Sequence, residues 1–489
     1  MRQAVRYLRN GVVVTLDHLD PAQTLLDHLR GDCHRHGTKE GCNEGDCGAC
    51  TVVLARIRDG VLVHEPVNSC ILLTGQVDGA EVITIEDLAT GSALHPVQQA
   101  MVDHHGAQCG FCTPGIIMSL FALYHEGARP VDRQAVVDQL AGNLCRCTGY
   151  RPIIDAALEA CARPASDRFR ATQRDRLKAL AALDAGGDLF IGTDARFFAA
   201  PATVESLAVL YAAHPDARIV GGATDVGLWI TKKLQDIPKV IWLGRVAGLD
   251  SIGRDAEGVH LGATVTLARA LPELGAIDPD LGEVLRRFGS KQVRASGTVG
   301  GNIANGSPIG DLAPCLIALG AKVRLASLAG GRSMPLEDFF IDYGKQNRAA
   351  GEFVAGLSAP FIGKGSHFRA FKVSKRFDED ISAVMGAFNI TLADGAVTAA
   401  RVAFGGMAAT PKRAVATERM LVGARIDDPS TWEGAIDVLG VDYRPIDDAR
   451  ASGAYRLATA RALLEKALFE IGSAPSSLTR IVGTREARP

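Results

Sequence analysis

The sequence GTKEGCNEGDCGACTV, residues 37–52, holds three of the chain's eleven cysteines in the spacing C-x4-C-x2-C. Three thiolates on one loop with a fourth farther along are typical of plant-type [2Fe–2S] ferredoxins. The intervening glycines let the loop curl and aim backbone N–H groups at cluster sulfurs. The predicted ligands of one cluster are therefore Cys42, Cys47, Cys50 and Cys70. A zinc site is the alternative that four cysteines leave open.

The sequence around this loop predicts a small sheet packed on a helix. An Asn-Gly pair at residues 10–11 lies between two alternating apolar segments and indicates a tight hairpin. Asp20, followed by proline, is expected to start a helix. Further strands are expected over residues 51–57 and 61–64.

A second group of cysteines occurs in CGFCTPG, residues 109–115, and CRCTGYRP, residues 145–152. A C-x2-C pair alone is weak evidence, but a C-x-C pair about 30 residues later strengthens it. Helices are expected over residues 95–104, 114–125, 132–141 and 152–162, and a cluster between helix N-termini gains from their free N–H groups. The predicted ligands of a second [2Fe–2S] cluster are Cys109, Cys112, Cys145 and Cys147.

The remaining cysteines and the bulk composition set limits on location and partners. Cys33, Cys161 and Cys315 belong to neither set and are expected to be small buried hydrophobic residues. No signal peptide and no apolar stretch of about 18 residues is evident, so we expect a cytoplasmic protein without disulfides or membrane spans. A net charge of −2 does not favour nucleic acid or a membrane surface as partner.

A length of 489 residues predicts three or four domains, of a multidomain α+β class. We expect a ferredoxin-like domain with a sheet over a helix, a helical iron–sulfur domain, and two further α+β domains after a linker. The expected boundaries are 1–84, 85–165, a polar linker over 166–190, 191–365, 366–476, and a poorly ordered tail over 477–489.

Two glycine-rich segments in the second half are candidates for a phosphate-containing cofactor. VGGATDVG (residues 220–227) and GTVGGNIANGSPIGD (297–311) could each offer backbone N–H groups to a pyrophosphate. Neither is the GxGxxG of a nicotinamide-binding unit. Flavin is favoured because iron–sulfur clusters move single electrons, whereas organic oxidations move pairs, and flavin converts between the two.

Six motifs occur in the order of a known family: the loop at 37–52, QCGFCTPG, NLCRCTGYRPI, VGGATDVG, KQVRASGTVGGNIANGSPIGD and FKVSKRFDEDI. The chain resembles the small iron–sulfur and flavin subunit of bacterial xanthine dehydrogenases, in the molybdenum hydroxylase family, over about residues 1–475. The resemblance implies a β-grasp ferredoxin-like domain, a four-helix iron–sulfur domain, an α+β FAD-binding domain and a C-terminal α+β domain. It also implies that the first cysteine set holds the cluster nearer the flavin and the second set the cluster nearer molybdenum.

The resemblance also implies roles for other residues. Gln108 would contact a molybdopterin held by the partner subunit, and no catalytic residue is expected on this chain. The loop KRFDED, residues 375–380, would affect NAD access, with a solvated charged turn as the alternative. The implied FAD contacts are Ile219, Val220, Gly221, Gly222, Ala223, Thr224, Asp225, Val226, Phe288, Thr298, Val299, Gly300, Gly301, Asn302, Asp311, Val354 and Lys372.

The function that the resemblance implies is an electron-transfer subunit. Hypoxanthine or xanthine would be oxidised to urate at molybdenum on a large partner subunit, in an assembly of two small and two large subunits. Electrons would pass through both clusters to FAD and on to NAD+. The alternatives are the same module in another molybdenum hydroxylase, acting on an aldehyde or N-heterocycle, or a stand-alone NADH diaphorase or electron carrier.

Overall fold

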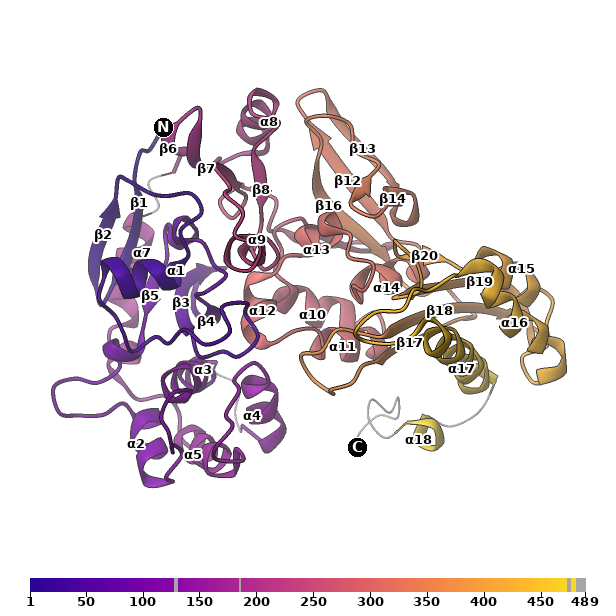
Figure 1. The fold of residues 1–489 in the computed structure, drawn as a ribbon, viewed down its shortest axis with the longest axis horizontal. Coiled ribbons are helices and arrows are strands. Elements are labelled where there is room, and N and C mark those ends of the chain that lie inside the picture. The colour runs from indigo at the N-terminus through magenta and orange to yellow at the C-terminus, as the bar shows by residue number, and fades with distance from the viewer. Residues whose placement is uncertain (127–130, 184–185, 473–475, 481–489) are drawn as a thin grey trace. The chain divides into compact units, whose positions relative to one another are not determined.

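The computed structural model describes residues 1–126, 131–183, 186–472 and 476–480. The chain divides into two compact units (Figure 1). The first comprises Met1–Ala247 and Gly289–Gly297, and the second comprises Gly248–Phe288 and Thr298–Pro489. Each unit has its own buried apolar clusters. In the described part of the chain, no helix is both long and apolar enough to cross a membrane.

The first unit begins with a five-stranded sheet in the order β2-β1-β5-β3-β4. Its strands are β1 (Val5–Arg9), β2 (Val12–Leu16), β3 (Thr51–Arg58), β4 (Val61–Asn68) and β5 (Glu81–Ile83). β1 and β5 are parallel, whereas the other pairs are antiparallel. The expected β-grasp domain is confirmed. The expected hairpin is also confirmed, with φ of 50° at Asn10 and 79° at Gly11, as a tight turn of this kind requires.

The expected helix start at Asp20 is wrong. Asp20 instead accepts a hydrogen bond from the Ala22 N–H at 3.0 Å and forms a turn. The helix α1 (Leu25–Asp27) begins four residues later, where the Thr24 hydroxyl accepts from the Asp27 N–H at 3.1 Å. A π-helical turn, His28–Asp32, continues it. Thr24 provides the side-chain cap, so the chain turns before the helix rather than at the Asp-Pro pair.

Four helices form the next part of the first unit, as expected. They are α2 (Pro96–Asp103), α3 (Thr113–His125), α4 (Arg133–Leu140) and α5 (Arg151–Cys161). α3 is buried along almost its whole length and forms the centre of this apolar cluster. Its N-terminus follows directly after Cys112, and α5 begins shortly after Cys147, so both cysteine pairs lie near helix starts.

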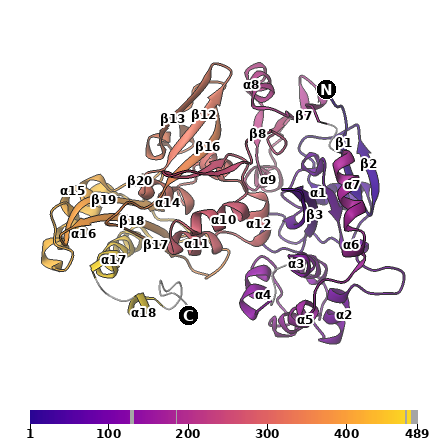
Figure 2. The same cartoon turned by 180° about the vertical axis from the view of Figure 1, so that it is seen from behind.

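The segment expected as a polar linker contains two packed helices, α6 (Arg168–Ala171) and α7 (Gln173–Leu183). Phe169 is 1% exposed, and Arg176 forms a buried ion pair with Glu81 of β5. Figure 2 shows α7 alongside the first sheet. A few buried side chains anchor the segment despite its polar composition, and its boundaries as a linker stay a prediction.

The first unit ends with a four-stranded sheet in the order β6-β7-β9-β8. Its elements are β6 (Leu189–Thr193), β7 (Arg196–Ala200), α8 (Val204–Ala213), β8 (Arg218–Val220), α9 (Val226–Thr231) and β9 (Lys239–Trp242). The short helix α12 (Lys291–Ser296) also belongs to this unit.

The second unit contains a sheet in the order β10-β11-β16-β12-β13 and another in the order β17-β18-β19-β20. The strands of the first sheet are β10 (Ile252–Arg254), β11 (Gly258–Gly262), β12 (Lys322–Ser327), β13 (Gly330–Pro335) and β16 (Phe353–Pro360). The helices in this part of the chain are α10 (Leu267–Gly275), α11 (Pro279–Arg286), α13 (Val299–Asn305) and α14 (Leu312–Leu319). A separate two-stranded sheet is formed by β14 (Phe340–Asp342) and β15 (Lys345–Gln346). The second sheet has β17 (Ser366–Val373), β18 (Val384–Ala393), β19 (Ala396–Gly405) and β20 (Lys412–Arg413), with α15 (Val415–Leu421), α16 (Glu433–Asp442) and α17 (Gly453–Gly472). The multidomain α+β class is confirmed.

The expectation of a poorly ordered tail is wrong for its first residues. Ser476–Thr479 form the helical turn α18, and the Arg480 guanidinium forms ion pairs with Asp280 and Glu470, both at 2.6 Å. All three side chains are nearly fully buried. The rest of the predicted tail, residues 481–489, lies outside the described residues.

Candidate iron–sulfur and flavin sites

The structure brings the four cysteines of the first predicted set together. The Cys42 thiol lies within hydrogen-bonding reach of the Cys47 and Cys70 thiols, and the Cys50 thiol within reach of that of Cys70. The Cys42 sulfur accepts N–H bonds from Asp46 at 3.4 Å and Cys47 at 3.3 Å. These are the donors that the loop was expected to aim at cluster sulfurs.

The space at this loop also suits a cluster. A Cβ on Gly41 would lie 2.8 Å from the Cys47 sulfur, so only glycine leaves room beside the sulfurs. The thiol pKa values shift in opposite directions: hydrogen bonds from Cys47 and Cys70 lower that of Cys42, and the same contacts raise those of Cys47 and Cys70. The residues fit a [2Fe–2S] cluster, and the ligand set stays a prediction.

The second predicted set forms two contacting pairs, Cys112 with Cys145 and Cys109 with Cys147. Burial, followed by the contact with Cys145, raises the pKa of Cys112 to about 12. The Cys145 sulfur lies 3.1 Å from the Thr148 hydroxyl. Cys145 is buried, whereas Cys109 and Cys147 are exposed, so one side of this site faces outward.

The two cysteine sites are joined directly by the backbone. The Leu144 N–H, next to Cys145, donates to the Cys47 carbonyl at 2.9 Å, and the Asn143 side chain donates to the Gly48 carbonyl at 3.1 Å. Gly48 has a φ of 66°, and a Cβ there would lie 2.0 Å from the Gly142 carbonyl oxygen. A larger residue at Gly48 would therefore push the two loops apart.

Gln292 connects the elements around both cysteine sites. The sequence predicted no role for it, although it lies in the motif at residues 291–311. The fully buried Gln292 amide nitrogen lies 3.2 Å from the Thr51 hydroxyl, 3.1 Å from that of Ser119 and 2.9 Å from the Asn143 carbonyl oxygen. An amide has only two protons for these three acceptors. Gln292 thus ties α12 to β3, α3 and the loop before Cys145.

We expect Gln292→Leu to weaken the first unit, because it removes the shared donor and leaves buried oxygens with fewer partners. The expected cost is about 1–3 kcal/mol of unfolding free energy. Urea unfolding followed by loss of visible iron–sulfur absorbance measures it. Lys291→Met is the matched control, since Lys291 forms only a partly exposed ion pair with Glu126. Equal midpoints for the two variants would contradict the role of Gln292.

A cluster of His95, His125 and Asp167 was not foreseen from the sequence. Among the described residues, these are the three His, Cys, Asp or Glu side chains whose ligand atoms all lie within 4.8 Å of one another. The Nε2 atoms of His95 and His125 lie 2.6 and 2.8 Å from the same Asp167 oxygen. His95 Nδ1 accepts the Val97 N–H at 3.2 Å, so its Nε2 carries the proton in the neutral ring. A protonated Nε2 donates to a carboxylate and cannot bind a metal. The cluster therefore anchors α6 to the helical domain.

The first predicted flavin segment, residues 219–226, forms the turn from β8 into α9. Ala223 has a φ of 63°, a strained conformation for a residue with a side chain. The Gly221 carbonyl accepts from the Gln76 amide at 3.0 Å and the Trp242 indole at 3.2 Å. The backbone of this turn is therefore fixed. The Gly227 and Leu228 N–H groups at the start of α9 donate to the Ala223 and Asp225 carbonyls at 2.7 and 3.0 Å, so the expectation of free N–H donors is wrong at Gly227.

This turn also contacts the first cysteine site. A Cβ on Gly227 would lie 2.5 Å from the Ile71 carbonyl, directly after Cys70. Leu228 packs on the small cluster that contains Cys50, Cys70 and Ile71. The Lys232 ammonium donates to the Cys42 carbonyl at 2.5 Å. The predicted flavin turn and the predicted cluster loop are thus neighbours within one unit.

We expect Gly222→Ala to lower flavin content sharply, because a Cβ there would lie 1.8 Å from the Ser296 carbonyl oxygen. The clash is with backbone, and overpacking of this kind costs about 1–3 kcal/mol. The flavin-to-protein ratio after gel filtration measures the effect. Gly31→Ala is the control, since a Cβ there meets nothing within 4 Å. Full flavin content in Gly222→Ala would show that the turn does not need this close approach.

The remaining predicted flavin contacts lie in the second unit. Thr298 caps α13 by accepting the Gly301 N–H at 3.0 Å. The N–H groups of Val299 and Gly300 donate to the Val265 and Ala263 carbonyls, both at 2.9 Å. The expectation of free N–H donors is therefore wrong at Val299 and Gly300, because the protein itself uses these groups. Flavin contacts through other atoms of this segment stay a prediction.

Two predicted contacts, Asp311 and Lys372, pair with each other. The Lys372 ammonium lies 2.6 Å from one Asp311 carboxylate oxygen, and the Ser382 hydroxyl donates to the other at 2.5 Å. Both charged side chains are almost fully buried. Val354 is buried in β16, and Phe288 packs against the same apolar cluster. The pair fixes the polar groups at the start of α14.

The predicted nicotinamide-access loop, residues 375–380, is held by contacts within the second unit. The Arg287 guanidinium stacks over the exposed Phe377 ring at 4.3 Å and donates to the Phe377 carbonyl at 3.0 Å. The Arg376 N–H donates to the Asp380 carboxylate at 2.9 Å. The role of this loop in NAD access stays a prediction.

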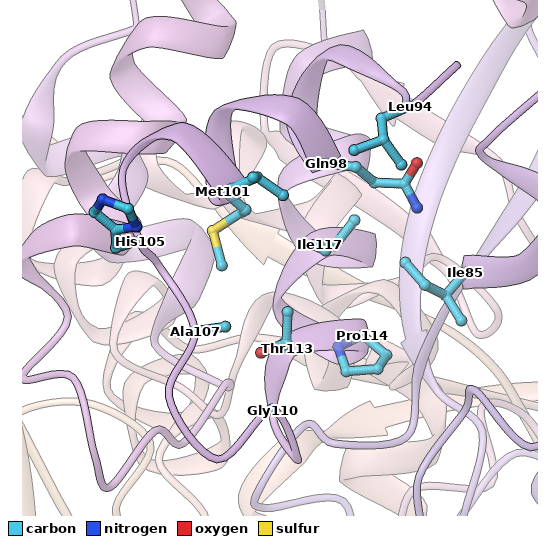
Figure 3. Close-up of a pocket in the computed structure, with 11 residues that line it drawn as sticks. Ile85, Leu94, Gln98, Met101, His105, Ala107, Gly110, Thr113, Pro114 and Ile117 are labelled. Carbon is cyan, nitrogen blue, oxygen red and sulfur yellow. The ribbon is translucent and has the colours of Figure 1, made fainter. Parts of the chain in front are cut away.

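A pocket of about 500 Å³ lies beside the second cysteine site. Figure 3 shows Met101 and Ile117 pointing into it, with Pro114 and Gly110 on the side of the cysteine loop. Gln108 is exposed on the same loop. Phe111 and Leu144 are also half exposed, so the outer side of this site carries apolar side chains as well as the polar Gln108.

Three family models match the chain. Residues 84–158 match a [2Fe-2S] binding domain, residues 193–362 match an FAD binding domain in molybdopterin dehydrogenase, and residues 369–471 match a CO dehydrogenase flavoprotein C-terminal domain.

Curated relatives include xanthine dehydrogenases. The one from Emericella nidulans is 33% identical, covering 90% of this chain and 36% of that protein. The one from Drosophila subobscura is 33% identical, covering 97% of this chain and 40% of that protein. The chain thus spans less than half the length of these relatives.

Similar solved structures cover about half of the chain. Quinoline 2-oxidoreductase from Pseudomonas putida 86 matches with a TM-score of 0.51 at 28% identity, over 56% of this chain and 95% of that chain. A Cu,Mo-CO dehydrogenase matches with a TM-score of 0.53 at 23% identity, over 56% of this chain and 97% of that chain, which shows the fold alone.

Proposed function

Because the chain belongs to the molybdenum hydroxylase family, as an iron–sulfur and flavin module, we propose that it is the electron-transfer part of a xanthine dehydrogenase. It would carry electrons from a molybdenum centre on a large partner subunit, where hypoxanthine or xanthine is oxidised to urate, to NAD+. When bound, two [2Fe–2S] clusters would supply one-electron carriers and FAD the conversion to two-electron chemistry.

The observation that carries this proposal is the continuous contact among the predicted cofactor sites of the first unit. The second cysteine site meets the first through Leu144 and the Cys47 carbonyl. The first cysteine site meets the predicted flavin turn through Ile71 and Gly227. These short backbone contacts support the order in which the second set receives electrons and the first set passes them to flavin.

The chain's own residues would position the cofactors and tune their potentials. The N–H groups of Asp46 and Cys47 point at the Cys42 sulfur, and such donors stabilise a reduced, more negative cluster. In the second unit the buried Lys372 places a positive charge beside Asp311, and both residues are predicted to contact flavin. In this electron relay, no side chain among the described residues is assigned a proton-transfer step.

The partner would dock at the second cysteine site. Cys109 and Cys147 are exposed there, and the surrounding surface carries exposed apolar side chains, including Val102 and Phe111 at 57% and 49% exposure. Gln108 lies on the same loop and is the candidate for a contact with the pterin. An apolar surface around an outward-facing redox site suits a protein partner.

The test is an anaerobic visible spectrum of the chain purified with whatever co-purifies from its own cells, before and after xanthine. Bleaching of flavin and iron–sulfur bands in the presence of a large partner is the expected result. Bleaching by NADH alone would leave an electron-transfer module but remove xanthine as substrate. Quinoline or an aldehyde is then the next substrate to try, because the structural relatives include a quinoline oxidoreductase.

A further inference from the structure

Cys33 lies outside both cysteine sets, and the expectation that it is a buried hydrophobic residue is wrong, although it holds for the fully buried Cys161 and Cys315. Cys33 follows the π-helical turn, and its N–H donates to the His28 carbonyl at 3.0 Å. Its side chain is half-buried. This places a partly accessible thiol on a backbone turn that also carries a histidine and an aspartate.

The polar groups around this thiol form an ordered chain. The Cys33 sulfur lies 3.4 Å from His28 Nε2, and His28 Nδ1 lies 2.8 Å from an Asp32 carboxylate oxygen. The Tyr7 hydroxyl lies 2.9 Å from His28 Nε2 and within hydrogen-bonding reach of the Cys33 sulfur. Nucleophile, base and orienting carboxylate are thus arranged as in a cysteine–histidine–aspartate triad.

The surroundings favour negative charge on the sulfur. The pKa of Cys33 is lowered: burial alone would raise it, but hydrogen bonding from His28, the positive charges of His28 and Arg9, and the Tyr7 hydroxyl outweigh burial. The pKa of His28 is raised, because contacts with Cys33 and Asp32 outweigh its burial. Arg35 adds a further positive charge facing Tyr7, and His34 faces Asp32. A thiolate beside an imidazolium is the nucleophilic form of cysteine.

We propose that Cys33, His28 and Asp32 form a thiol oxidation site that reacts with small hydroperoxides. The Cys33 thiolate attacks the outer peroxide oxygen, so that an S–O bond forms and the O–O bond breaks. The sulfur is oxidised to a sulfenic acid and the peroxide is reduced. His28 Nε2, which holds the former thiol proton, returns it to the leaving oxygen, giving water or an alcohol.

The geometry selects a small oxidant over a bulky disulfide. Cys33 is only half exposed, and the Tyr7 and His28 donors cover it from the core side, since both are almost fully buried. Asp32 and Gln23, joined by a 3.0 Å hydrogen bond, line a cavity of about 430 Å³, so the carboxylate that orients His28 is open to solvent. The site needs neither cluster nor flavin for its chemistry.

The test measures Cys33 alone in the full chain with its cofactors bound. Iodoacetamide alkylation is followed from pH 5 to 10 by mass spectrometry of the Cys33 peptide, and sulfenic acid is trapped with dimedone after hydrogen peroxide. We expect a midpoint below the value near 8.5 of a free cysteine, because His28 and Tyr7 stabilise the thiolate, and trapped sulfenic acid at Cys33.

Variants assign the roles. Asp32→Asn, at an exposed side chain, should raise the midpoint and slow sulfenic acid formation at least about threefold, and His28→Gln should slow it at least about tenfold. Asp17→Asn, which lines the same cavity, is the matched control and should behave as the unchanged protein. If His28→Gln fails to fold, Tyr7→Phe and Asp32→Asn still test whether the polar groups around Cys33 promote its oxidation. An ordinary midpoint, no trapped sulfenic acid, or an Asp32→Asn variant equal to the control would overturn the proposal.

Discussion

Replacement of Cys147 by serine is expected to remove one of the two iron–sulfur signals and to stop substrate-driven reduction of the flavin. Cys147 is an exposed member of the second predicted ligand set, paired with Cys109. Iron content should fall from about four to about two atoms per chain. Losing even an outer partner of a metal site costs 10–100-fold in affinity or activity, so loss of a ligand should slow flavin reduction more than about 100-fold.

The measurements are iron analysis, electron paramagnetic resonance of the reduced protein, and stopped-flow absorbance of the flavin with substrate. Cys161→Ala is the matched control, because Cys161 is a fully buried cysteine of the same helical domain outside the ligand set. It should keep both signals. NADH should still reduce the flavin in Cys147→Ser, since that route does not need the second cluster. Unchanged substrate-driven flavin reduction would refute the proposed relay order.

Lys372→Met is expected to destabilise the second unit by about 3–5 kcal/mol and to abolish flavin retention. The substitution leaves the Asp311 carboxylate buried without its cation, and a broken buried ion pair costs this much. The Lys372 ammonium also donates to the Asp380 carbonyl at 2.7 Å, so the loop at residues 375–380 should loosen as well. Flavin release during thermal unfolding, compared with loss of helical circular dichroism, measures both effects.

Lys375→Met tests whether the loss of any lysine in this region would destabilise the second unit and release the flavin. Lys375 is exposed and its ammonium donates to the Ala449 carbonyl at 3.1 Å, so loss of this side chain should leave stability and flavin content nearly unchanged. The double substitution Lys372→Met with Asp311→Asn removes both charges and should recover part of the lost stability. No recovery in the double variant would mean that Lys372 acts through another partner.

Much of the fold of the first unit followed from local sequence. The Asn-Gly pair forces positive φ at residues 10 and 11, so the hairpin was predictable from two residues. The four helices of the iron–sulfur domain were placed to within a residue or two, because apolar periodicity and flanking prolines mark such boundaries. The start of α1 was misplaced because both Asp20 and Thr24 are good caps, and only packing on the sheet selects one.

Contacts between distant segments could not be predicted. The segment at 166–190 is polar, and the packing of its two helices depends on Phe169 and Arg176 meeting partners about 50 and 95 residues away. The buried Arg480 looks from the sequence like part of an unstructured tail, yet it pairs with an aspartate 200 residues earlier. Val299 and Gly300 resembled free donors because their carbonyl acceptors lie on another segment.

The sequence by itself determined the chemical inventory of this protein: eight cysteines in two spaced sets, two glycine-rich segments and the order of its domains. Ligand spacing and turn chemistry are local properties, so they depend on residues that are close together in the sequence. Only the tertiary structure decided how these parts connect. It joined Cys47 to Leu144, Ile71 to Gly227 and Cys33 to His28, and it made Gln292 a junction of three elements. The physical reason is that hydrogen bonds and close packing depend on distances in space, which residue spacing along the chain does not fix.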